Sequence, residues 1–185
     1  MANKKDNSSD VAYAVLRAAR AHFVYAGAFI GSIVIFDSWN LITHEGIVQR
    51  WTAAAALLFV TTVVWYLSRG GSRSSLYYKL LAKALITTDI IFAAYNVYLQ
   101  RGMASKAVAL FAVPIITAAI LKSRRTILAT AILSTAAYTF ASVKYFHLHY
   151  GEGFKVELYG EIFFYSAIFF VLSALLIGLV RPKNP

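Results

Sequence analysis

The sequence has no cysteine and few charged residues, and each shortage excludes a class of protein. Without cysteine the chain cannot form a disulfide framework, a thiolate nucleophile or a Cys-based zinc site. Charged residues make up 14% of the 185 residues, against roughly 25% in ordinary soluble domains. Hydrophobic residues make up 59%, which excludes intrinsic disorder, since disordered chains are poor in such residues. A soluble domain of this size could not bury so much apolar surface, so the composition predicts a membrane protein.

The sequence also lacks the common motifs of enzymes. It has no Walker A loop, no GxSxG nucleophile elbow and no HExxH zinc motif, so we predict neither catalytic residues nor a bound cofactor. His147 and His149 form a His-x-His pair that can bind a transition metal, and His44 lies in another loop. Nothing in the sequence brings the two loops together, so we expect solvated histidines and no metal site. His22 is the one histidine within an apolar stretch, which argues against a haem between helices.

Apolar stretches dominate what is present. A bilayer core about 30 Å thick is spanned by about 20 apolar residues in a helix. Six stretches approach this length, and flanking Tyr, Trp and Lys side chains can extend them to the interface. We therefore predict an all-α, six-transmembrane-helix bundle formed by residues 11–185 as a single domain, behind a disordered cytoplasmic N-terminus at residues 1–10. The predicted spans are residues 21–36, 52–67, 84–99, 107–121, 127–143 and 162–180.

The basic residues predict the orientation of these spans. The net charge is +10, and the Lys and Arg residues lie between the apolar stretches. With the N-terminus inside, thirteen of the 18 basic residues fall on the inner side, which matches the positive-inside rule for short loops. Both termini are thus predicted to be cytoplasmic, and the first helix is predicted to remain uncleaved. The five outer basic residues are Arg50, Arg101, Lys106, Lys144 and Lys155.

Asp89 is the most informative single residue. It lies in the middle of the third predicted span, where an Asp costs roughly 2.5–3.5 kcal/mol on insertion scales. Asn96 and Gln100 follow at i+7 and i+11, so all three share one helix face. This stripe is either a ligand, proton or signal site, or a set of polar groups that only hold helices together.

Three further features concern the other helices. Glu161 begins the sixth span, and Lys144 is a plausible partner for it in a rim ion pair. Gly27 and Gly31 form a GxxxG motif in the first span, which favours close helix contact either within the chain or in a dimer, and we expect the contact within the chain. Pro114 is expected to kink the fourth span.

Residues 80–180 resemble the six-helix membrane sensor region of bacterial histidine kinases of the redox- and quinone-sensing type. The resemblance rests on Asp89 early in the third helix, the outer turn around Gly102, Pro114 in the fourth helix and the basic inner turn at residues 122–125. No dimerisation helix, phosphoacceptor histidine or ATP-binding domain follows Val180. The resemblance therefore implies a sensor module that has no kinase activity of its own.

These observations lead to one functional expectation and one alternative. We expect a non-enzymatic signalling module in a bacterial plasma membrane. Its expected partners are the lipid bilayer, a second copy or another membrane or cytoplasmic protein, and a small hydrophobic or quinone-like ligand, but not nucleic acid. The alternative is the substrate-binding membrane subunit of a vitamin-type, energy-coupling-factor transporter, which has a similar size and helix number.

Overall fold

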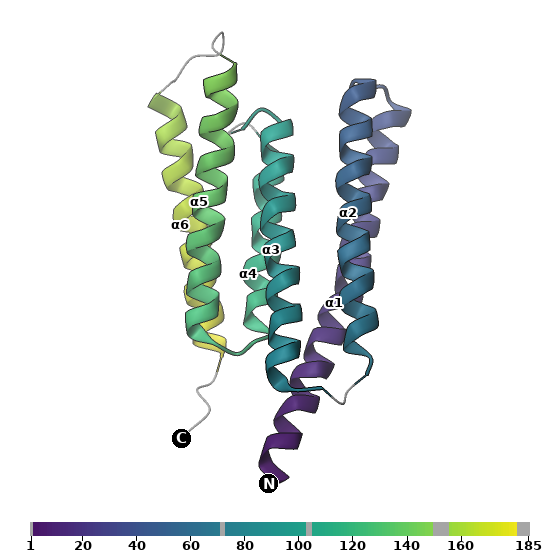
Figure 1. Cartoon of the computed structure of the whole chain (residues 1–185). Coiled ribbons are helices and arrows are strands. Elements are labelled where there is room, and N and C mark those ends of the chain that lie inside the picture. Colours follow the sequence, from purple (N-terminus) through teal and green to yellow (C-terminus); the bar gives the residue numbers. More distant parts are fainter. Residues whose placement is uncertain (1, 71–72, 103–104, 150–155, 181–185) are drawn as a thin grey trace. The chain divides into compact units, whose positions relative to one another are not determined.

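The computed structural model describes residues 2–70, 73–102, 105–149 and 156–180, and no strand occurs among them. This confirms the all-helical class. The elements, shown in Figure 1, are α1 (Ala2–Ser38), α2 (His44–Ser68), α3 (Ser75–Leu99), the 3₁₀ helix η2 (Lys106–Phe111), α4 (Ala112–Ala119), α5 (Arg124–Leu148) and α6 (Val156–Leu179).

Five of these helices, α1, α2, α3, α5 and α6, are long and apolar enough to cross a membrane. The chain thus has the helices of an integral membrane protein. The fourth predicted span is different, because residues 106–119 form a shorter apolar segment that starts as a 3₁₀ helix. Of the six predicted spans, the structure therefore contains five as long α-helices.

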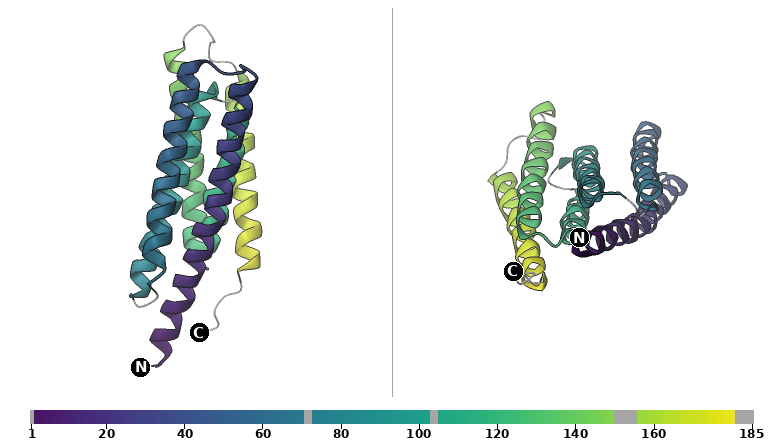
Figure 2. Two further views of the ribbon diagram at one scale, coloured as in Figure 1. Left: turned by 90° about the vertical axis from the view of Figure 1, so that its right-hand side faces the viewer. Right: turned by 60° about the horizontal axis from the view of Figure 1, so that its bottom comes forward.

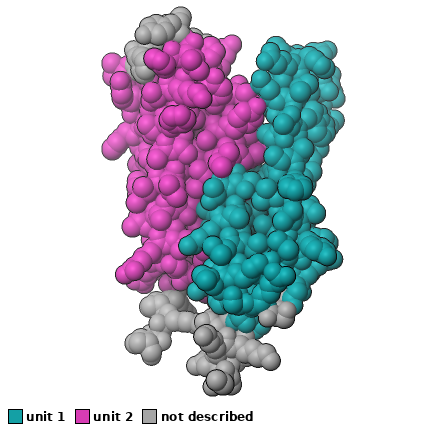
Figure 3. All heavy atoms as spheres, in the orientation of Figure 1, with its two compact units in different colours: residues 1–88 teal, residues 89–185 magenta. Residues whose placement is uncertain are grey.

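The chain divides into two compact units, residues 1–88 and 89–185, where the sequence predicts a single domain (Figure 3). The division falls within α3, so the first half of this helix belongs to unit 1 and the second half to unit 2. We describe each unit by itself.

Unit 1 is built on the hairpin of α1 and α2, which run side by side in both views of Figure 2. Asn40 ends the first helix in a left-handed conformation (φ 50°), and the Thr43 hydroxyl begins the second by accepting a hydrogen bond from the Gly46 amide. Buried residues recur every three to four positions along both helices, which is the spacing of interlocking helix packing. On α2 they are Ala54, Leu57, Thr61, Val64 and Ser68.

Two predictions for the first helix are wrong. Residues 2–10 are helical rather than disordered, because no Gly precedes Gly27 and nothing interrupts the helix as it extends back from the apolar part. The GxxxG motif makes no close contact with another helix in the described part of the chain, since a Cβ added at Gly27 or Gly31 would meet no atom within 4 Å. The fully buried small residues on this helix include Ala19 and Ala26; Ala26 is one position from Gly27, so packing uses a neighbouring face.

Unit 2 packs η2 and α4 against α5 and α6. Gly102 adopts φ +63°, and a Cβ there would lie 3.3 Å from the Ser142 Cα and from the Tyr145 Cβ, so this turn lies against the backbone of α5. The Ser123 hydroxyl then caps α5 by accepting from the Thr126 amide.

Pro114 does not kink the middle of a helix, as the sequence suggested. It is the third residue of α4, where its missing N–H has little effect because first-turn amides have no partner within the helix. The irregularity lies before it, where the 3₁₀ helix ends at Phe111 and the α-helix begins.

Several sequence expectations lie outside the described residues. These concern the turn at residues 150–155, including Lys155, and the basic C-terminal residues Arg181 and Lys183.

Candidate functional site

The polar stripe predicted on α3 is partly present. Asp89 and Asn96 are both fully buried, as expected for polar groups seven residues apart on one face. Gln100 is not part of this stripe, because α3 ends at Leu99 and the Gln100 side chain accepts a hydrogen bond from the Ser105 hydroxyl (3.3 Å). Gln100 therefore closes the turn between α3 and η2.

Asn96 has an unused hydrogen-bonding group in the interior. Its amide nitrogen donates to the Phe92 carbonyl one turn earlier (2.8 Å). Its amide oxygen is buried and has no hydrogen-bond partner among the described residues. A buried acceptor without a partner costs about 1–3 kcal/mol, so such an atom is usually satisfied by a water or a ligand.

A second polar row, which the sequence analysis missed, runs along α5. Thr130, Ser134, Tyr138 and Ser142 are buried and recur every fourth residue, so they form one line along the helix. The Thr130 hydroxyl donates to the Thr126 carbonyl, whereas the Ser134 hydroxyl has no partner within the described part of the chain. The sequence signal was a hydroxyl at every fourth position of an otherwise apolar span.

Aromatic rings surround the middle of this row. The Tyr138 ring makes edge-to-face contacts with Phe111 of η2 (6.1 Å), Tyr165 of α6 (5.7 Å) and Phe169 of α6 (6.2 Å between centroids). Such contacts are worth about 0.5–1.5 kcal/mol each beyond the area they bury. The cluster therefore fixes η2, α5 and α6 around the Tyr138 hydroxyl.

Glu161 lies near this cluster, but not in the expected ion pair. Its half-buried carboxylate is within electrostatic range of the Tyr138 hydroxyl. The Lys144 ammonium group instead lies over the rings of Tyr98 (5.7 Å) and Phe140 (5.8 Å), and no ion pair links it to Glu161 among the described residues. Cation–π contacts of this kind hold the lysine at the edge of the bundle.

The histidines are dispersed. His44 is the first residue of α2, and the imidazole of His149 stacks on Tyr145 (4.2 Å) at the end of α5. His22 is buried, and its Nδ1 lies 2.8 Å from the Ala18 carbonyl oxygen. Within the described ranges, no three His, Asp or Glu side chains gather as metal ligands.

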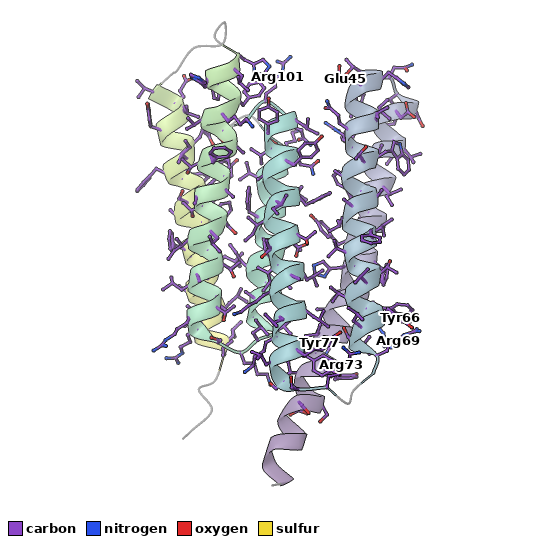
Figure 4. The ribbon with its side chains drawn as sticks, in the orientation of Figure 1. Glu45, Tyr66, Arg69, Arg73, Tyr77 and Arg101 are labelled. Atoms are coloured by element: carbon purple, nitrogen blue, oxygen red, sulfur yellow. The ribbon has the colours of Figure 1, made fainter. Side chains whose placement is uncertain are left out.

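Unit 1 carries an aromatic and basic cluster at one end, of which Arg69, Arg73 and Tyr77 are labelled in Figure 4. The Arg69 guanidinium carbon lies 3.4 Å from the centre of the Trp65 ring, and that of Arg73 lies 4.7 Å from the centre of the Tyr77 ring. Arginine and aromatic side chains at helix ends are typical of a membrane–water interface. This cluster thus anchors one end of the unit 1 helices.

Together these features define a helical integral membrane protein with buried polar groups in its apolar interior. In comparisons with known proteins, no protein-family model, curated protein or solved structure matches the chain.

Proposed function

We propose that the protein is a non-enzymatic, sensor-like membrane module whose interior polar site is formed by Asp89 and Asn96. The observation that carries this proposal is the complete burial of both side chains on a membrane-spanning helix. Ionisable groups at this depth are costly and commonly mark proton or ligand sites. The Asn96 amide oxygen, which has no hydrogen-bond partner among the described residues, favours a ligand with a hydrogen-bond donor or a bridging water. The resemblance to redox-sensing kinases favours a quinone-like molecule, whose hydroxyls in the reduced quinol form can supply that donor.

The proposal includes six membrane crossings with both termini in the cytoplasm. Five crossings are formed by the long helices, and residues 106–119 would form the remaining one, the fourth in chain order. Six residues of 3₁₀ helix and eight of α-helix extend roughly 24 Å, which supports this crossing. In Figure 1, this segment returns from the end of unit 2 where α3 finishes to the opposite end, where α5 begins. A 3₁₀ start therefore lets a short segment cover most of the apolar layer.

Labelling of single cysteines tests the topology without interference, since the chain has none of its own. Both Glu45 and Arg125 are exposed. Glu45 follows the first proposed crossing and would lie outside, whereas Arg125 follows the fourth and would lie inside. In intact cells, an impermeant maleimide should label Glu45→Cys, whereas Arg125→Cys should react only after permeabilisation. Equal labelling of both in intact cells would refute the proposed orientation.

Quinone binding tests the site. The purified protein in lipid nanodiscs is titrated with ubiquinone-1 and menadione, each in its oxidised and its reduced quinol form, while its thermal unfolding is followed. We expect a quinone-dependent rise in Tm that is lost in Asp89→Asn and Asn96→Leu but kept in Gln100→Ala, the matched control outside the stripe. A shift that survives both interior substitutions would exclude this site.

The identity of the neighbouring genes distinguishes the proposed sensing role from the alternative role in transport. A neighbouring histidine kinase or response regulator would support the signalling role. A neighbouring pair of ABC-type ATPases would favour the transporter subunit instead.

A further inference from the structure

A narrow apolar groove lies between η2–α4 and α6, entirely within unit 2. Its volume is about 300 Å³, at the small end of the range of ligand pockets. Carbon atoms form nearly all of its wall. The lining residues that matter here are Lys106, Ala109 and Ala112 on one side and Tyr165, Ile168 and Leu172 on the other.

The 3₁₀ geometry explains why the groove exists. In a 3₁₀ helix residues three apart are eclipsed, so Lys106 and Ala109 of η2 lie in one row, and Ala112, the first residue of α4, also lines the groove. Two of the three are alanines, which leave space that a larger side chain would fill. The α6 residues stand at i, i+3 and i+7, which places them in a parallel row on the facing helix.

The dimensions fit one extended hydrocarbon chain. The 3₁₀ row is about 12 Å long and the α6 row about 10 Å, from the rise per residue of each helix. A groove of this length and of about 300 Å³ can hold one extended acyl chain.

The charge of Lys106 indicates which kind of molecule with an acyl chain the groove would bind. Lys106 is the one charged residue of the lining, and it stands where η2 begins, at the end of unit 2 where α3 and α5 finish. Its side chain is exposed and has no ion pair in the part of the chain that the structure describes; Glu161 is not part of the lining. A free ammonium group at the mouth of an apolar slot complements an anionic head group attached to an acyl chain.

We propose that this groove binds one acyl chain of an anionic phospholipid, with the lipid phosphate on Lys106. A phospholipid is favoured over a soluble anion because the wall is apolar along its length and Ile168 and the neighbouring α6 residues Phe164 and Val171 are exposed on a helix that can span the membrane. The lipid fills the space beside the aromatic cluster of Phe111, Tyr138, Tyr165 and Phe169. This inference is independent of the proposed quinone site.

Photo-crosslinking tests the proposal on the full-length protein. Phosphatidylcholine nanodiscs carry a small fraction of either phosphatidylglycerol or phosphatidylcholine with a diazirine in one acyl chain, and adducts are mapped by mass spectrometry. We expect phosphatidylglycerol adducts on residues 106–112 and 165–172 at about five times the yield of phosphatidylcholine. This factor corresponds to roughly 1 kcal/mol for one basic residue near an anionic lipid.

Two kinds of variant separate charge from shape. Lys106→Gln should lower the phosphatidylglycerol yield at the groove to that of phosphatidylcholine. Lys144→Gln removes the same charge from α5, outside the groove, and should leave the yield unchanged. Ala112→Leu fills the slot and should reduce adducts of both lipids there, and Ala109→Leu serves the same purpose if the first variant fails to fold.

Three results would overturn the proposal. Equal labelling by the two lipids would mean that only general bilayer contact occurs at the groove. An equal effect of Lys106→Gln and Lys144→Gln would mean that net charge, and not this site, attracts the lipid. Loss of groove adducts on addition of palmitate, without any preference for phosphatidylglycerol, would identify a free fatty acid as the occupant.

Discussion

Replacing Gly102 by Ala tests the close contact between the α3–η2 turn and α5. The backbone of Gly102 has φ +63°, a conformation that costs an L-residue roughly 1–2 kcal/mol. The added Cβ would also lie 3.3 Å from the Ser142 Cα and 3.4 Å from the Ser142 carbonyl oxygen. These are backbone atoms of a helix and cannot rotate away as a side chain can.

The two effects add because one concerns the backbone of residue 102 and the other its neighbours. Overpacking a tight site typically costs about 1–3 kcal/mol. We therefore expect Gly102→Ala to lower the free energy of unfolding by about 2–5 kcal/mol. Gly31→Ala is the matched control, since its Cβ would meet nothing within 4 Å and Ala favours a helix by up to roughly 1 kcal/mol.

The measurement is unfolding of the purified variants in mild detergent by titration with sodium dodecyl sulfate, followed by circular dichroism. Gly102→Ala should unfold at a clearly lower fraction of sodium dodecyl sulfate than the parent, and Gly31→Ala at an equal or higher one. A Gly102→Ala protein as stable as the parent would show that the turn does not lie against α5. A strongly destabilised Gly31→Ala protein would show that the GxxxG motif packs after all.

The same assay checks three smaller predictions. Ser123→Ala should cost about 1 kcal/mol through loss of the N-cap of α5, whereas Ser123→Asp should retain stability. Arg69→Gln should cost about 0.5–1 kcal/mol by removing the contact with Trp65, and no loss would show that the pair is only a solvated neighbour. Asp89→Leu should cost about 1–3 kcal/mol because it leaves the buried partner of Asp89 unsatisfied, while Asp89→Asn keeps the shape and hydrogen bonding and should cost less. A Leu variant as stable as the parent would place Asp89 outside the interior.

The spans could be predicted because apolar length is a local property of the sequence. Residues 127–143 lie within α5, and residues 162–180 cover all of α6 except its first six residues and extend one residue beyond it. The helix starts were also readable in principle, since Thr43 and Ser123 are typical N-cap residues. The helices extend beyond the apolar stretches because polar residues at their ends remain helical while the side chains reach the interface.

Which face of a helix packs against its neighbour could not be predicted in the same way. Ala26 and Gly27 are adjacent small residues whose directions differ by about 100° around the helix axis. The sequence suggested the glycine face, but the buried residue is the alanine, since the choice depends on the surface of the neighbouring helix. Asp89 and Asn96 were placed correctly because their seven-residue spacing is itself close to two helical turns.

The fourth predicted span, residues 106–119, was predictable in its apolar length but not in its helix type. The helix type in turn determines the shape of the proposed lipid site. Its apolar length was evident in the sequence, but nothing local distinguished a 3₁₀ start from an α-helix. With α-helical geometry, residues three apart would be offset by about 60° around the axis, so Ala112 would point about 120° away from Lys106 and the three residues would not face α6 as one row. With three residues per turn they align, and the two alanines leave an open slot that ends at a lysine. The helix type that allows a short segment to cross most of the apolar layer therefore also creates the groove beside it, so a substitution that converts η2 to an α-helix should remove the lipid preference even if Lys106 is kept.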